Sequence, residues 1–554
     1  MKKIILKGLL SFCLGGVFTL QAETLSNTVL SLPSTDIVVD FNGDGSTDIL
    51  TRNYSNGNIY TILVENNGTN ATLNKIVSGP ENWFIMNKSD FNGDGITDIL
   101  AWNYLDGNLY TLLVNSDGTE TTLNKIENAL SPDDWNILES ADFNGDEVDD
   151  ILLQRYSDGN LYTLIVANDG TSATLNKIVS GLSLDEWKVI KTADFNDDNI
   201  EDVLLQRFSD GNLYTAIVNS DGTSATLNKI ASGLDYYWKI LRLGYFSDFN
   251  YDKTTDILLQ RVSDGNLYIL LLNDEGTNAS FKKIASGILE DDWDILQTGY
   301  FNDDGITDLL VRRKSDGNLY TLLIESDGDS STLNKVVNAI PSSEWRIVGN
   351  GDFNGDDITD TLVQRKSDGN LYTILIDSDG TAATFNKIVS GVPNSEWRII
   401  NIADFNNDNH TDILIQRQSD GNLYTVILNE SATSASLNKI VSGLDYNWEL
   451  AKSSSLYNSA PVAISTNPLY EEVVSENSSD NNIYLDGYDE EGDNLHFQII
   501  VPPEHGTVEI RFGVEAYYTP EEGYIGHDEF EFIIFDGELS SNVATILIDV
   551  SEQN

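Results

Sequence analysis

The chain has 554 residues, which is long enough for several domains or for one large repetitive domain. It carries 32 basic and 88 acidic residues, and the resulting net charge of −56 repels phosphate backbones and anionic lipid headgroups. The composition therefore argues against nucleic acid as a partner, and we expect no such partner.

Residues 1–22 have the layout of a cleavable signal peptide, with three lysines ahead of an apolar run that ends in Ala22. A lipoprotein signal would modify Cys13, but Phe12 precedes this cysteine and the apolar run continues past it. Cys13 is the only cysteine, so the mature chain has no disulfide. No later apolar run reaches the ~20 residues that cross a bilayer. We expect an exported protein that is secreted, periplasmic or at the cell surface, without membrane insertion.

A short acidic motif, "DFNGDGITD" in one of its copies, recurs along most of the chain. Its eight copies are spaced by 50 to 54 residues and begin at Asp40, Asp90, Asp142, Asp194, Asp248, Tyr300, Asp352 and Asp404. A period of this size predicts a propeller or a solenoid, because a unit of this length cannot bury its faces alone. We assign residues 23–455 to the repeat array.

Each repeat predicts four β-strands. In the seventh repeat, the alternating "EWRIVGNGDF" precedes the acidic loop, and "DTLVQRK" follows it. The Asp-Gly turn of "KSDGN" leads to "GNLYTILI", and a second Asp-Gly turn leads to "ATFNKIV". Four antiparallel strands per repeat are typical of a propeller blade.

The two ends of the array predict a closed ring. Seven repeats begin with a strand that carries a tryptophan, whereas the first repeat has Pro33 in that place. An extra tryptophan strand, "NWELAK" around Trp448, follows the last repeat. We expect this strand to complete the first blade, which gives an all-β, eight-bladed propeller. Seven blades remain the alternative.

The acidic loop has the residues of a calcium site. Oxygen-bearing side chains stand at positions 1, 3, 5 and 9 of the motif, and hard oxygen donors without His or Cys suit Ca²⁺. Position 6 favours a residue that tolerates positive φ, which Glu147 and Lys253 do poorly, so we expect weaker binding in their loops. A metal-free turn rich in Asn and Asp is the alternative.

Eight divalent ions would add 16 positive charges to the net charge of −56 and so relieve repulsion between the crowded carboxylates. Metal binding and folding should therefore be coupled. The sixth loop is doubtful, because Tyr300 replaces its first Asp. The expected ligands are Asp40, Asn42, Asp44, Asp48, Asp90, Asn92, Asp94, Asp98, Asp142, Asn144, Asp146, Asp150, Asp194, Asn196, Asp198, Asp202, Asp248, Asn250, Asp252, Asp256, Asn302, Asp304, Asp308, Asp352, Asn354, Asp356, Asp360, Asp404, Asn406, Asp408 and Asp412.

The eight copies of D-F-N-x-D-x-x-x-D resemble the FG-GAP/VCBS repeats of integrin-α-like β-propellers, and the resemblance covers residues 36–452. It implies a propeller with Ca²⁺ in the loop between the first two strands of each blade. It does not imply one activity, because the family includes adhesion receptors, lectins and accessory parts of enzymes.

Residues 459–554 carry short alternating strands separated by turns, which predict a β-sandwich. Phrases such as "YYTPEEGYIGHDEFEFIIFDG" are similar to the cadherin-like, Ig-type modules of bacterial surface proteins. Asp489, Glu491 and Asp493 suit either another Ca²⁺ or a solvated acidic turn.

The sequence offers no catalytic set. His410 lies in an acidic loop, and the other histidines, all after residue 459, lack metal-ligand spacing. A recurring cluster in "QRYSDGNLY", with Gln154, Arg155, Asp158 and Tyr162, suits either a sugar site or packing between strands.

We therefore expect a non-catalytic calcium-binding protein that recognises or adheres to an extracellular glycan or surface protein. The alternative is a secreted carbohydrate-active enzyme, a polysaccharide lyase or glycosidase, with one specialised cleft between blades.

Overall fold

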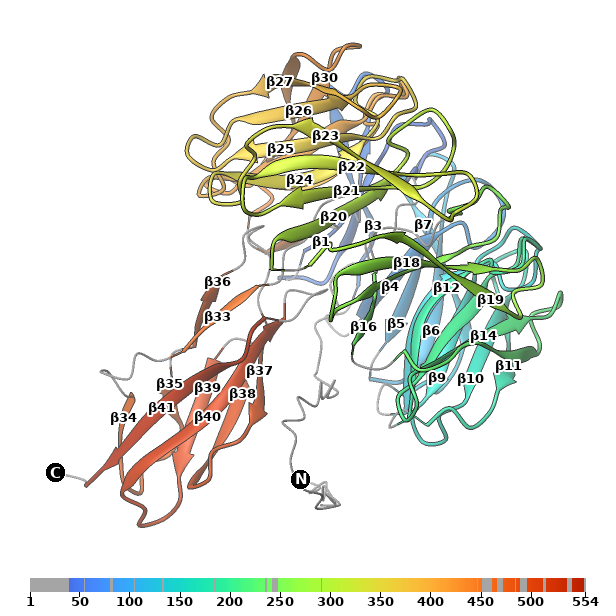
Figure 1. Ribbon diagram of the computed structural model, residues 1–554. Coiled ribbons are helices and arrows are strands. Elements are labelled where there is room, and N and C mark those ends of the chain that lie inside the picture. The colour runs from blue at the N-terminus through green and yellow to red at the C-terminus, as the bar shows by residue number, and fades with distance from the viewer. Residues whose placement is uncertain are drawn as a thin grey trace. The chain divides into compact units, whose positions relative to one another are not determined.

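The computed structural model describes residues 39–53, 55–79, 83–103, 105–131, 134–183, 186–234, 237–241, 248–289, 291–445, 447–450, 461–465, 472–483, 485–488, 496–511, 515–535 and 541–552. These residues form strands and turns and contain no helix, so none of them builds a helix that could cross a membrane (Figure 1). They fall into two compact units that divide between residues 459 and 460. The expected signal peptide, residues 1–22, lies outside the described residues.

The first unit consists of eight four-stranded antiparallel sheets, one for each repeat, and we number these blades 1 to 8 in chain order. The first strands are β32 (Trp448–Leu450) for blade 1, then β4 (Trp83–Ser89), β8 (Trp135–Ala141), β12 (Trp187–Ala193), β16 (Trp238–Ile240), β20 (Trp293–Gly299), β24 (Trp345–Gly351) and β28 (Trp397–Ala403). The second strands are β1 (Ile49–Asn53), β5 (Asp98–Asn103), β9 (Asp150–Arg155), β13 (Asp202–Arg207), β17 (Ile257–Arg261), β21 (Asp308–Arg313), β25 (Asp360–Arg365) and β29 (Asp412–Arg417).

The remaining two strands of each blade complete the sheet in the order first, second, third, fourth. The third strands are β2 (Ile59–Val64), β6 (Asn108–Val114), β10 (Leu161–Val166), β14 (Asn212–Val218), β18 (Asn266–Leu272), β22 (Asn318–Ile324), β26 (Leu371–Ile376) and β30 (Asn422–Leu428). The fourth strands are β3 (Ala71–Val77), β7 (Thr121–Glu127), β11 (Ala173–Val179), β15 (Ala225–Ala231), β19 (Ala279–Ala285), β23 (Ser331–Val337), β27 (Ala383–Val389) and β31 (Ala435–Val441).

Strand β32 closes the ring. It pairs antiparallel with β1, with Trp448 opposite Asn53 and Leu450 opposite Thr51, so the sheet of blade 1 runs β3-β2-β1-β32. The prediction of eight blades, with the first blade completed from the far end of the array, is confirmed. Seven blades are excluded, because all eight sheets are present.

Backbone hydrogen bonds join every pair of neighbouring blades. In each blade the N–H at position 8 of the acidic loop donates to the carbonyl at position 1 of the preceding blade, over 2.7–3.4 Å. The bond from Thr47 to the carbonyl of Asp404 links blade 1 to blade 8 at 2.9 Å. The loops therefore form a closed circle of eight bonds.

The core lies between the faces of neighbouring blades. Second and third strands are mostly buried, whereas the fourth strands expose about every other residue. In seven blades a buried threonine of the third strand donates to a carbonyl in a turn of the next blade; Thr425, for example, donates to Gly68 across the closure. Ile269 replaces this threonine in blade 5, so that seam lacks the bond.

The second unit contains the described residues after position 460. Its strands are β33 (Val462–Ile464), β34 (Glu472–Ser475), β35 (Asn481–Ile483), β36 (Asp486–Tyr488), β37 (His496–Val501), β38 (Gly506–Arg511), β39 (Glu515–Pro520), β40 (Gly526–Phe535) and β41 (Ala544–Ser551). They form sheets β34-β41-β40-β37, β35-β39-β38 and β33-β36 around a core that includes Tyr518, Phe530 and Phe532. The prediction of an all-β terminal domain is confirmed.

Candidate functional site

The eight acidic loops connect the first strand of each blade to the second. A phenylalanine at position 2 anchors each loop, and all eight of these side chains are at most 2% exposed. Position 9 lies at the start of the second strand or immediately before it. The two ends of each loop are thus fixed, and positions 3 to 6 lie at the surface.

The aspartate at position 1 organises the loop around its own carboxylate. In blade 1, Asp40 Oδ1 accepts N–H bonds from Asn42, Gly43 and Asp44, and its Oδ2 accepts from Gly45. The bond from position 6 to Oδ2 recurs at 2.7–2.9 Å in every blade except blade 6. Seven loops therefore share one backbone shape.

Position 6 adopts a left-handed backbone in all eight loops, with φ between 62° and 87°. Glu147 and Lys253 adopt it as well, although neither residue type favours it. The bond from their N–H to the carboxylate at position 1 holds them there. The predicted conformation is confirmed, and weaker metal binding by these two loops stays a prediction.

The aspartate at position 9 is buried within the blade. In blade 1, Asp48 Oδ1 accepts the N–H of Val64 on the third strand at 2.8 Å, and its Oδ2 accepts the N–H of Phe41 at 2.9 Å. Burial raises the pKa of Asp48 to about 8; the two N–H bonds oppose this rise, and the charges of Asp40 and Asp44 add to it. Burial likewise raises the pKa of the other seven to about 8, at Asp98, Asp150, Asp202, Asp256, Asp308, Asp360 and Asp412.

Positions 3 and 5 complete each loop. The aspartate at position 5 accepts the N–H of position 7 at 2.9–3.1 Å in all eight loops. In seven of them the asparagine at position 3 donates to the same aspartate. These bonds hold the side chains at positions 3 and 5 within the loop, and their role as metal ligands stays a prediction.

The donor set of seven loops fits a hard divalent cation, because it consists of oxygens only and because the charges at positions 1 and 5 raise the pKa of the aspartate at position 9. In the seventh loop, the buried Asn354 Oδ1 has no hydrogen-bond partner and so is free to contact a cation. Among the described residues no three carboxylates converge as a formed metal centre, since most of their oxygens face backbone N–H groups. Asp489, Glu491 and Asp493 lie outside the described residues.

The sixth loop differs from the other seven. Tyr300 has no carboxylate, so the N–H bonds to position 1 are missing, and Asn302 Oδ1 and Asp308 Oδ2 are buried without a hydrogen-bond partner. The loop contacts blade 7 instead, where the N–H of Asp303 donates to the carbonyl of Ser378 at 3.1 Å.

Position 8 breaks the symmetry in blades 3 and 4. Six blades have a threonine there, whereas blade 3 has Asp149 and blade 4 has Glu201. Burial raises the pKa of Asp149 to about 6 and that of Glu201 to about 7, and the charge of nearby Glu139 adds to the latter rise. Glu139 forms an ion pair with Lys191 across the seam. This group was not among the residues predicted from the sequence, although Asp149 and Glu201 depart visibly from the threonine of the repeat.

The arginine clusters that suited a sugar site are engaged within each blade. The Arg155 guanidinium lies 5.6 Å from the Trp135 ring and 5.5 Å from the Tyr162 ring, and it pairs with Asp158. The side chain of Gln154 donates to a backbone carbonyl. The same arrangement recurs at Arg207, Arg261, Arg313, Arg365 and Arg417. Because these side chains are engaged with one another, the contacts favour packing between strands over a sugar site.

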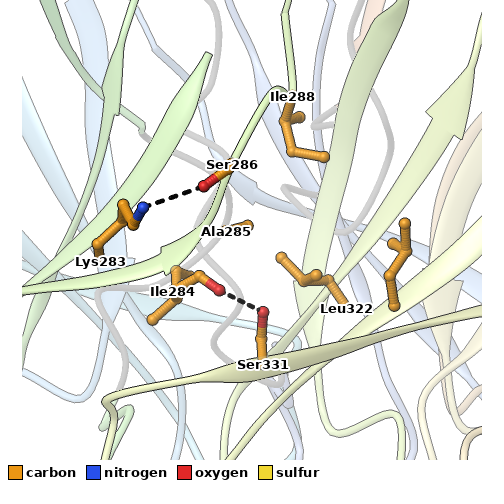
Figure 2. A pocket seen from close by; sticks show the side chains of 8 residues that line it. Lys283, Ile284, Ala285, Ser286, Ile288, Leu322 and Ser331 are labelled. Atoms are coloured by element: carbon orange, nitrogen blue, oxygen red, sulfur yellow. Dashed lines mark hydrogen bonds between the residues drawn. The ribbon is translucent and has the colours of Figure 1, made fainter. Parts of the chain in front are cut away.

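A cavity of about 300 Å³ lies between blades 5 and 6, along β19, β22 and β23. Figure 2 shows that its polar side chains bond locally: Lys283 Nζ donates to Ser286 Oγ at 3.2 Å, and Ser331 Oγ donates to the carbonyl of Ile284 at 2.7 Å. The remaining lining side chains drawn there, such as Leu322, are apolar. The cavity therefore offers little to orient a ligand.

Comparison with protein families agrees with the motif. Residues 90–153 match the FG-GAP-like repeat family, and residues 458–549 match the bacterial Ig domain family. The resemblance drawn from the sequence is thereby confirmed. A search of curated proteins finds no match.

Solved structures give only distant likenesses. A beta-fructofuranosidase from Schwanniomyces occidentalis, complexed with fructosyl-erythritol, is 10% identical over 76% of this chain and 97% of its own, with a TM-score of 0.26. An endo-fucoidan hydrolase from glycoside hydrolase family 107 is 13% identical over 57% of this chain and 39% of its own, with a TM-score of 0.16. At such TM-scores neither likeness bears on activity or ligand.

Proposed function

We propose that the protein is an exported, calcium-binding, non-catalytic propeller that recognises an extracellular glycan or a surface protein. FG-GAP-like repeats and Ig-type domains fit such a role in recognition or adhesion, and domain families of this kind are typically not enzymes. The repetition within the ring supports the proposal, because nearly all its distinctive polar residues recur from blade to blade, whereas a catalytic site needs a single arrangement.

The observation that carries the calcium part is the buried carboxylate at position 9, which lies beside two further acidic positions in seven of the eight loops. Side chains at positions 1, 3, 5 and 9 would hold Ca²⁺ in every loop except the sixth. A bound cation would supply positive charge that keeps these carboxylates ionised and holds the first two strands of each blade in register. The ligand-binding surface would then lie on a scaffold that needs calcium to stay folded.

A glycan array tests the proposal, with the full mature chain applied in Ca²⁺ and again in a chelator. Retention of a glycan in Ca²⁺, with no cleavage products after prolonged incubation, is the expected result. Cleavage products would overturn the non-catalytic assignment. Without glycan retention, pull-down of a surface protein is expected, and failure of both would overturn the recognition role.

The second candidate, a secreted carbohydrate-active enzyme, is favoured by one observation. Glu139, Lys191 and Glu201 gather between blades 3 and 4, Asp149 lies at the adjoining seam with blade 2, and none of the four is repeated elsewhere in the ring. If incubation with a polysaccharide releases products, Glu201→Gln should abolish the release while leaving retention unchanged. Product release that survives this substitution would exclude the group as the site.

A further inference from the structure

Two exposed tyrosines mark the place where the ring departs most from its repeat. Tyr251, at position 4 of the fifth loop, is 70% exposed, and Tyr300, at position 1 of the sixth loop, is 50% exposed. By contrast, the third-strand tyrosine of each blade packs on its tryptophan at 4.8–5.3 Å between ring centroids. Within the described part of the chain, neither exposed ring contacts another ring.

The backbone of both residues is held in place. Tyr251 has a φ of 63°, a left-handed conformation that a bulky residue rarely adopts and for which four other blades use glycine at the same position. Its ring lies beside the sixth loop, since a Cβ built on Gly305 would be 3.0 Å from Tyr251 Cε2. Tyr300 is held by Thr359 of blade 7 through two bonds, of 2.7 and 3.0 Å. The Tyr251 ring therefore lies against the sixth loop from blade 5, and Tyr300 begins that loop on a backbone held by blade 7.

The surface between the two rings is polar. Asp303 and Asp304 are exposed there. Beneath them, Asn302 Oδ1 and Asp308 Oδ2 have no hydrogen-bond partner, and the side chain of Asp308 is fully buried. Since Tyr300 takes the place of the first carboxylate, this loop is also the least suited of the eight to a cation. The exposed carboxylates of Asp303 and Asp304 are therefore the acceptors of this loop that a surface ligand can reach.

We infer that Tyr251 and Tyr300 form a binding platform for a neutral glycan chain, with each ring stacking on a sugar face and the carboxylates of the sixth loop accepting sugar hydroxyls. This inference rests on the proposed function and selects the glycan among its ligands. Aromatic faces combined with planar hydrogen-bonding groups suit the apolar faces and polar edges of pyranose rings. Two rings separated by a loop suit a chain of sugars better than a single sugar.

The charge of the protein and the polarity of the surface beside the two tyrosines restrict the class of ligand. The net charge of −56 and the exposed carboxylates of the loop disfavour sulfated or uronic acid polymers. The polar surface between the rings disfavours a protein partner, because protein interfaces are centred on a contiguous desolvated patch. A neutral polysaccharide remains as the class of ligand.

Native gels cast with soluble neutral polysaccharides (a β-glucan, a xylan, a mannan and a galactan), or with alginate as an anionic comparison, test the inference. The full mature chain is compared with Tyr251→Gly, which introduces the residue found in four blades, and with Tyr300→Asp, which restores the repeat. Phe208→Ala is the matched control, because Phe208 is a 54% exposed aromatic residue at the opposite end of a second strand, away from the acidic loops.

We expect at least one neutral polymer to retard the parent chain and Phe208→Ala equally. The two tyrosine variants should lose at least about tenfold in affinity, as expected when a stacking contact is removed. Their melting temperatures should not fall, since both substitutions move toward the repeat. This separates lost binding from lost folding.

Equal retardation of the parent chain and both tyrosine variants would overturn the platform while leaving glycan recognition intact. Retardation by alginate in preference to the neutral polymers would overturn the assignment of ligand class. No retardation of the parent chain by any polymer would overturn the inference together with the glycan branch of the proposed function, leaving the protein-ligand branch to be tested separately.

Discussion

Removal of calcium should make the stability of the propeller depend steeply on pH. Each aspartate at position 9 has a pKa of about 8 in the fold, against ~3.9 in an unfolded chain. At pH 7 this difference in pKa lowers the free energy of unfolding by about 4 kcal/mol per loop. Three such loops together match the whole free energy of unfolding of a typical domain, about 5–15 kcal/mol. The proposed cation would offset this cost in the seven loops that have an aspartate at position 1.

The direction of this pH dependence follows from the linkage between protonation and folding. Because the pKa is raised in the folded state, the contribution of each group to stability is fully present below pH ~4 and is lost as the pH rises through about 8. In a chelator, the melting temperature should therefore rise as the pH falls from 8 to 5. Bound Ca²⁺ would keep the carboxylates ionised, so the stabilisation by Ca²⁺ should be largest at pH 8 and shrink toward pH 5.

The assay is thermal and denaturant unfolding of the full chain at pH 5, 6, 7 and 8, in Ca²⁺ and in a chelator. Asp360→Asn removes one titrating group and should reduce the pH slope in chelator by up to about 1.4 kcal/mol per pH unit. Glu430→Gln, at an exposed turn, is the control and should leave the slope unchanged. A chelated protein that is more stable at pH 8 than at pH 5, or an equal effect of Ca²⁺ at both, would refute the reasoning.

Three further substitutions test the packing of the ring. Thr425→Val leaves the buried carbonyl of Gly68 without its hydrogen-bond donor at the closure of the ring. This substitution should destabilise the propeller by about 1–3 kcal/mol in denaturant unfolding. An unchanged free energy of unfolding would show that this hydrogen bond does not stabilise the closure. Gly355→Ala combines a φ of 71° with a Cβ only 2.3 Å from Nε2 of His410 and should lower the melting temperature by several degrees, whereas an unchanged value would contradict the packing of the loops on one another. Arg365→Ala should weaken stability slightly and leave glycan retention intact; loss of retention would show that the recurring arginines bind sugar after all.

Much of the fold could be predicted from the sequence, because the same strand, turn and loop signals occur in each of the eight repeats. Aspartates and asparagines at fixed positions specify the loop through bonds to their own backbone, so position 6 could be expected at positive φ even before Glu147 and Lys253 are seen there. Pro33 at one end of the array and Trp448 at the other indicated which strand completes blade 1, and the pairing of Trp448 with Asn53 agrees.

The candidate sites were harder to predict, because they depend on side chains about 50 residues apart that meet only across a closed seam. Nothing in the local sequence shows that Glu139 pairs with Lys191, or that Tyr251 lies beside Gly305. The arginine cluster had the opposite problem: its composition suits a sugar, but Arg155 is already engaged by neighbouring rings and a carboxylate. Departures from the repeat pointed to unusual surfaces more reliably than its shared residues did.

Counting bound Ca²⁺ per chain after exhaustive chelation and re-addition tests whether calcium holds the proposed recognition ring together. We expect seven ions, one for each loop with an aspartate at position 1, and an eighth in Tyr300→Asp. A chain that binds no calcium and melts at the same temperature with and without chelator would contradict this expectation.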